Sequence, residues 1–170
     1  ELVDNHVEIP SLKIENSEIK HFIVELFKSK QILPLKEVKD VDVWTYVKSR
    51  MIPESMYSRL YFTNNFFNIN TQIKNMLNPS KQFEMREGED KRLMWMFKTI
   101  TNDVVALQGR RIDKMEPRYL ISRFNSDDNR LIGGIEFINI NDPVYITEGY
   151  VDSLFLPNAV SLNGLHLPSI

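Results

Sequence analysis

Hydrophobic residues in the first half of the chain recur every three or four positions, which is the spacing of one helix face. From Ile19 to Phe27 they alternate in this way with charged residues, and Ser17 stands where a helix cap is expected. Pro53 fits the first position of a further helix, because this position needs no backbone donor. We expect helices over residues 18–29, from Asp40 or Asp42 to Lys48, over 53–60 and over 66–77, with extended stretches at 32–35 and 60–63.

From residue 84 the pattern becomes that of strands. Hydrophobic residues alternate from Leu93 to Thr99 and resume at Val104. Asn102-Asp103 lies between them and suits a tight turn, since both residue types tolerate left-handed backbone angles, so a hairpin is expected. Further along, we expect a strand at 118–121, buried strands at 144–147 and 159–162, and between these two a helix packed by Leu154, Phe155 and Leu156.

This order of elements indicates an α+β fold that is followed by an α/β segment. The first predicted unit covers residues 1–142, with helices over 16–80 and a small antiparallel sheet over 90–125. The second unit covers residues 143–170 and has the pattern β-α-β. The boundary is expected at 139–143, because proline can begin a strand without donating to its neighbour.

Composition narrows the chemistry. The 170 residues include no cysteine, which excludes disulfides, a cysteine nucleophile and any zinc site built on cysteine. There is no run of about 18 apolar residues, so we expect no membrane partner and a cytoplasmic location.

Charge is distributed unevenly along the chain. The whole sequence has a formal net charge of −2, but residues 108–123 carry a local excess of basic residues and 127–170 a local excess of acidic ones. A basic segment before an acidic one suits phosphate contact beside a metal site. Uneven surface charge is the plainer interpretation of the same pattern.

Two acidic residues in the β-α-β segment are the strongest candidates for chemistry. Glu148 ends the first strand, and ligands of α/β proteins bind at the carboxyl ends of parallel strands. A carboxylate there suits Mg²⁺ binding or proton transfer. Asp152 falls in the first turn of the helix, where a negative charge is favourable by itself, so a purely structural role remains open.

Three separate segments resemble bacterial and bacteriophage DNA primases. Residues 144–164, with the form Glu-Gly-Tyr-x-Asp-x-Leu, resemble the start of a TOPRIM domain, the catalytic module that primases share with topoisomerases and some nucleases. The hairpin that leads into Gly109-Arg110 and the following Pro117-Arg118-Tyr119 resemble the N-terminal subdomain of the primase core. The stretch 46–53 resembles a Tyr-x-x-x-Arg-x-Ile-Pro element of phage primases.

The resemblance implies synthesis of RNA primers on single-stranded DNA from nucleoside triphosphates. It implies that Glu148 is the catalytic acid and a ligand of Mg²⁺ or Mn²⁺, with Asp152 as its companion. Nucleotide or template binding is implied for the basic and aromatic residues Arg110, Arg111, Arg118 and Tyr119. A replicative helicase is a further implied partner. The implied location of the protein is the cytoplasm, which is that of the host if the source is a phage.

The sequence departs from that family in two places. The Asp-x-Asp pair that supplies most metal ligands in a TOPRIM domain does not follow Glu148, and the cysteine zinc ribbon is absent. We therefore expect a fragment, a trimmed product or one half of a split enzyme, inactive until a second chain or segment completes the domain. The alternatives are a non-catalytic module that binds single-stranded DNA or a replication partner, and another TOPRIM enzyme such as a nuclease or topoisomerase.

Overall fold

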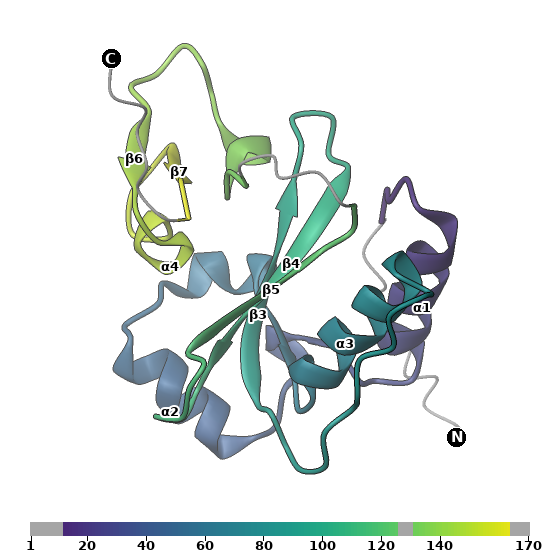
Figure 1. Cartoon of the computed structure of the whole chain (residues 1–170). Helices are drawn as coiled ribbons and strands as arrows, with labels where there is room; N and C mark the ends of the chain where they lie inside the picture. Colours follow the sequence, from purple (N-terminus) through teal and green to yellow (C-terminus); the bar gives the residue numbers. More distant parts are fainter. Residues whose placement is uncertain (1–11, 126–130, 164–170) are drawn as a thin grey trace, which may run out of the picture.

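A computed structural model describes residues 12–125 and 131–163 of the chain. At its centre lies a five-stranded antiparallel sheet in which each strand pairs with the next along the chain (Figure 1). The strands are β1 (Leu33–Pro34), β2 (Tyr61–Thr63), β3 (Arg92–Lys98), β4 (Val104–Arg111) and β5 (Tyr119–Arg123). The predicted hairpin is confirmed as β3 and β4, and Asn102 in its turn has the left-handed φ of 67°.

Helices cover both faces of this sheet (Figure 1). On one face lie α1 (Ser17–Lys28) and α3 (Phe66–Leu77), and on the other lie α2 (Val41–Ser49) and the short α4 (Tyr150–Ser153). Three 3₁₀ helices connect these elements: η1 (Leu35–Glu37), η2 (Glu54–Arg59) and η3 (Ile135–Phe137).

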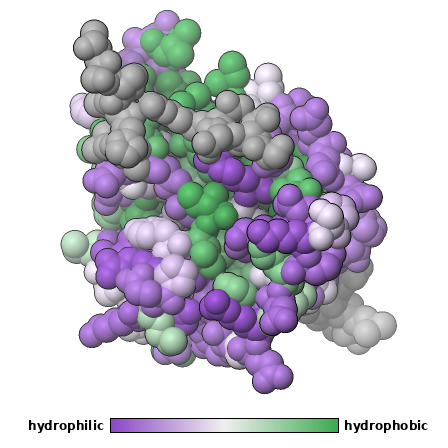
Figure 2. Space-filling model, in the orientation of Figure 1, coloured by the Kyte–Doolittle hydropathy of each residue, from purple (hydrophilic) through white to green (hydrophobic). Residues whose placement is uncertain are grey.

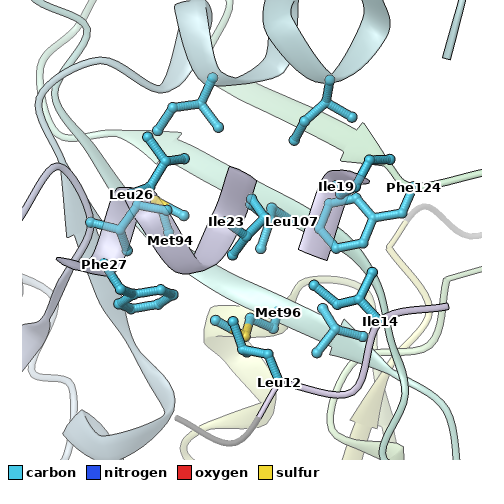
Figure 3. Packing of buried hydrophobic residues seen from close by; sticks show 14 of the residues in the cluster. Leu12, Ile14, Ile19, Ile23, Leu26, Phe27, Met94, Met96, Leu107 and Phe124 are labelled. Carbon is cyan, nitrogen blue, oxygen red and sulfur yellow. The ribbon is translucent and has the colours of Figure 1, made fainter. Parts of the chain in front are cut away.

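Strand alternation divides the core into two clusters. Met94, Met96 and Leu107 point from the sheet toward α1 and α3, where they meet Ile19, Ile23 and Phe27 (Figure 3). The intervening positions of the same strands, among them Trp95 and Phe97, point to the opposite face. Burial of both faces explains why β3 is almost continuously hydrophobic.

The helix caps follow the sequence with one correction. Asn16, not Ser17, caps α1, because its side chain accepts from the backbone N–H of Glu18 and Ile19 at 3.1 and 3.0 Å. Asp40 caps α2, as one of the two predicted alternatives. Lys91 also donates to Asp40 at 2.8 Å, and this hydrogen bond lowers the pKa of Asp40 below its ordinary value.

The segment after Pro53 is also different from the prediction. It forms η2 rather than an α-helix, and Pro53 has extended backbone angles and precedes the helix instead of starting it. The predicted strand at 60–63 exists as β2, and it extends the main sheet by pairing with β3.

The predicted β-α-β pattern is present at the end of the described chain. β6 (Tyr145–Thr147) and β7 (Ala159–Ser161) pair in parallel as a separate two-stranded sheet, and α4 connects them. The predicted burial is wrong for β6, whose Tyr145 and Ile146 are 48% and 60% exposed. The connecting helix is also shorter than expected: Phe155 and Leu156 follow it and are exposed, although Leu154 is buried. Residues 164–170 of the predicted unit lie outside the described residues.

No helix among residues 12–125 and 131–163 is long and apolar enough to cross a membrane. The predicted division of the chain at residues 139–143 stays a prediction.

Candidate functional site

A pocket of about 350 Å³ lies where α4 and the end of β6 meet β4 and β5. Its lining brings together Tyr119 from the main sheet with Glu148 and Asp152 from the β-α-β segment, three residues that the sequence singled out separately. The remaining lining residues are Gln108, Ile121, Gly149, Tyr150 and Asn163. The two sequence segments with candidate chemistry therefore meet at one pocket.

Packing of α4 on the sheet places the two segments together. Tyr150 is buried, and its ring stacks on Trp95 of β3 with centroids 5.0 Å apart and an angle of 6° between the planes. Phe97 meets the same tyrosine edge to face at 6.3 Å. Because Tyr150 directly follows Glu148-Gly149, its packing against the sheet fixes the position at which β6 ends and Glu148 follows.

The backbone around Glu148 is held from β7. Asn163 donates its N–H to the carbonyl of Glu148 at 3.0 Å, and Leu162 donates to Thr147 at 3.0 Å. A β-carbon at Gly149 would lie 2.8 Å from Oδ2 of Asp152, so a larger residue would make this carboxylate shift. Glycine therefore lets the carboxylate of Asp152 lie against the start of α4, with both acids exposed at the surface.

Tyr119 forms the wall of the pocket on the sheet side, and Arg110 lies behind it, outside the lining. They are direct partners in the pairing of β4 and β5, and Nη1 of Arg110 donates to the Tyr119 hydroxyl at 2.6 Å. Arg110 is 8% exposed and also lies over the ring of Tyr46 at 5.8 Å. Tyr119 is 42% exposed, so its ring is accessible to a ligand while its hydroxyl stays bonded to the guanidinium.

Burial is the main cause that raises the pKa of Tyr119 above its ordinary value, and the charge of Asp152 acts in the same direction. Arg110 and Arg50 oppose this rise. The tyrosine is therefore protonated at neutral pH and serves as a hydrogen-bonding and stacking group rather than as a base.

The other two predicted basic residues, Arg111 and Arg118, also lie outside the lining of this pocket. Arg111 lies on the opposite face of β4 from Arg110, since neighbouring residues of a strand alternate. Its guanidinium pairs with Asp90 at 3.0 Å and Asp113 at 2.7 Å, so its charge is already neutralised. Arg118 precedes Tyr119 and its side chain is 61% exposed, with Glu116 as an ion-pair partner at 4.0 Å.

A buried arginine that the sequence did not indicate supports this wall. Arg92 is fully buried and donates to the carbonyls of Gly109, Pro117 and Arg118 at 3.1, 2.9 and 3.2 Å. Its Nε also donates to Asp90 at 2.8 Å. Arg92 thus ties together the strand ends that present Arg110, Arg118 and Tyr119.

The described residues contain no group of three or more histidine, aspartate and glutamate side chains that could hold a metal ion. Glu148 and Asp152 are the carboxylates that line the pocket. Oxygen ligands suit Mg²⁺ or Mn²⁺, and Mg²⁺ is usually held by one or two carboxylates together with phosphate and water. The donor set therefore fits a cation that arrives with a phosphate ligand.

Comparison with known proteins points to primases. No family model matches the chain. The DNA primase of Enterobacteria phage T4 is 28% identical over 129 residues, which cover 76% of this chain and 36% of that protein. The chain thus spans about a third of the length of this curated relative.

Solved structures with a similar fold include primase catalytic cores. The chain matches the Aquifex aeolicus primase, zinc-binding and RNA polymerase domains, with a TM-score of 0.55 and 19% identity over 76% of this chain and 38% of that one. It matches a DnaG primase catalytic domain bound to single-stranded DNA with a TM-score of 0.57 and 15% identity over 88% of this chain and 58% of that one. The resemblance to DNA primases that the sequence indicated is confirmed.

Proposed function

We propose that this chain forms the N-terminal part of a primase-type RNA polymerase core, which synthesises RNA primers on single-stranded DNA during replication. The observation that carries the proposal is the pocket in which Tyr119, backed by Arg110, faces the carboxylates Glu148 and Asp152. Phosphoryl transfer depends mainly on positioning and charge neutralisation, so a site for it needs cationic and anionic groups side by side. Here they come from two segments that α4 holds together.

Arg110 and Arg118 would bind phosphate in different ways. Arg110 is oriented by Tyr119 and is mostly buried, which suits a fixed contact with the nucleotide. Arg118 is exposed at the rim and suits the backbone of the template strand. Arg111 is kept as a weaker candidate, because Asp90 and Asp113 already neutralise it.

Glu148 and Asp152 would hold Mg²⁺ or Mn²⁺ together with the phosphates of a nucleoside triphosphate. When bound, the cation neutralises developing charge on the phosphate oxygens. Glu148 follows a strand whose backbone is paired with β7, so the backbone position from which its side chain extends is fixed. Asp152 lies against Gly149 and supports the same side of the pocket.

The β6 side of the molecule would be covered in the complete enzyme. Val144, Tyr145, Ile146, Phe155 and Leu156 are all at least 38% exposed. Figure 2 shows hydrophobic residues at the surface in the upper part of the molecule. Such a face on a two-stranded parallel sheet supports the proposal that further strands, from a segment or a second chain, complete a TOPRIM domain and its metal site.

A non-catalytic module that binds single-stranded DNA or a replication partner such as a helicase is the second candidate. It is favoured by the lack of a group of three or more metal-binding side chains in the part of the chain that the structure describes. This candidate predicts DNA binding that needs no divalent cation and no change when Glu148 is replaced.

Replacing Arg118 by glutamine is expected to weaken binding of single-stranded DNA and to reduce its dependence on salt. One lost phosphate contact should lower the slope of log affinity against log salt concentration by roughly 0.7. Fluorescence anisotropy of a labelled oligonucleotide over a range of salt concentrations measures this slope. Stability should not change, because the side chain is exposed.

Lys20→Gln is the matched control, since Lys20 is exposed on α1, on the other face of the sheet. It removes one positive charge without touching the proposed site. If both variants lower the slope equally, DNA binds through diffuse charge and the proposed interface is wrong.

A further inference from the structure

Gln108 is an unusual residue for its place in the sheet. It lies on β4 directly opposite Trp95 of β3 and Ile121 of β5, on the face that packs against Tyr150. Its side chain is 3% exposed, and its Oε1 has no hydrogen-bond partner among the described residues. A buried amide oxygen without a partner costs stability, so a hydrophobic residue would serve the core better.

The same side chain lines the pocket that contains Tyr119, Glu148 and Asp152. It sits two residues before Arg110 on the same face of β4, which is a distance of about 6.7 Å along a strand. A single nucleotide can therefore touch both residues. The neighbouring Trp95 also has a buried Nε1 without a partner among the described residues, so unsatisfied polar atoms lie together under this pocket.

We propose that Gln108 binds the nucleoside part of a nucleotide, through a sugar hydroxyl or a base edge, while the phosphates lie toward Arg110. This inference rests on the proposed function, because it assumes that a nucleotide occupies the pocket. A neutral amide both donates and accepts hydrogen bonds, as hydroxyl groups and base edges do. Phosphate and metal are better matched by the charged groups already present, Arg110 and the two carboxylates.

The test uses Gln108→Met, which keeps the size of the side chain and removes its polar atoms. ATP with Mg²⁺ should bind to the variant roughly 3- to 10-fold more weakly than to wild type, as measured by calorimetry. The variant should be at least as resistant to urea as wild type, because it no longer buries an unpaired amide. If Gln108 had only a structural role, the variant would be less stable than wild type. Gln82→Met, in an exposed loop, is the control and should change neither property.

NMR of the Gln108 side-chain amide separates the possible ligands. ATP should shift this resonance, whereas inorganic tripolyphosphate should shift Arg110 and leave Gln108 unchanged. A smaller shift with dATP than with ATP identifies the 2′-hydroxyl as the partner, and a difference among the four ribonucleotides identifies the base edge.

ATP that perturbs Arg110 and Tyr119 but not Gln108, with equal affinity for Gln108→Met, overturns the inference and leaves the proposed function intact. Failure of every nucleotide to perturb the pocket would count against both.

Discussion

Replacing Arg92 by methionine is expected to lower the free energy of unfolding by about 3–5 kcal/mol, the usual cost of removing one partner from a buried ion pair. Arg92 is fully buried and its Nε lies 2.8 Å from Oδ2 of Asp90. In the variant, the buried carboxylate of Asp90 would lose this partner. The carbonyls of Gly109, Pro117 and Arg118 would also lose a donor. Urea denaturation followed by circular dichroism measures the change.

Gly109 leaves room for the side chain of Arg92 to extend over β4 toward the segment before β5. A β-carbon at position 109 would lie 2.8 Å from Cδ of Arg92 and from Cγ of Phe66, so the side chain passes where only glycine leaves room. The Gly109-Arg110 pair thus combines a backbone position that Arg92 requires with a side chain that bonds Tyr119 at the pocket. Arg118→Met is the control, because it removes an exposed guanidinium from the segment before β5 and should cost less than about 0.5 kcal/mol. Equal losses for the two variants would show that Arg92 does not act through its buried contacts.

Replacing Glu148 by glutamine is expected to reduce primer synthesis about 100-fold or more, in an assay where the chain is supplied with the segment that completes the site. The change keeps the shape of the side chain and removes the negative charge that is proposed to hold the cation or accept a proton. Synthesis of labelled primers on a single-stranded template measures the effect. The affinity for single-stranded DNA should stay within a few-fold of wild type, because Arg118 at the rim of the pocket is unchanged.

Glu54→Gln serves as the matched control, since Glu54 is an exposed carboxylate on η2 outside the pocket. It should support normal synthesis. Full activity of Glu148→Gln would remove Glu148 from the catalytic role and favour the simple binding module.

Periodicity predicted most of the helices and strands, because their buried faces are set by regular spacing. α1, α3 and the β3–β4 hairpin bury the hydrophobic residues that the pattern marked. The wrong cap of α1 has a local cause. Asn16 and Ser17 can each cap a helix, and the backbone geometry selects Asn16. The exposure of β6 could not be predicted, because an apolar pattern does not tell whether another element covers the strand.

The site was predicted only as far as charged residues and a motif could mark it. Tyr119, Glu148 and Asp152 line one pocket with Arg110 behind the tyrosine, but the pairing of Arg111 with Asp90 depends on residues that are distant in sequence. Gln108 carried no signal, since a single glutamine in a strand is ordinary until its burial is known.

We propose that one pocket between β5 and α4 receives a nucleotide together with a divalent cation. Paramagnetic Mn²⁺ added with ATP broadens NMR signals of nearby residues, so it locates the cation directly. Broadening is expected at Glu148, Asp152 and Tyr119, and it should be lost in Glu148→Gln. Broadening centred instead on the acidic residues Asp42 and Asp113, which line a different pocket beside α2, would contradict this proposal.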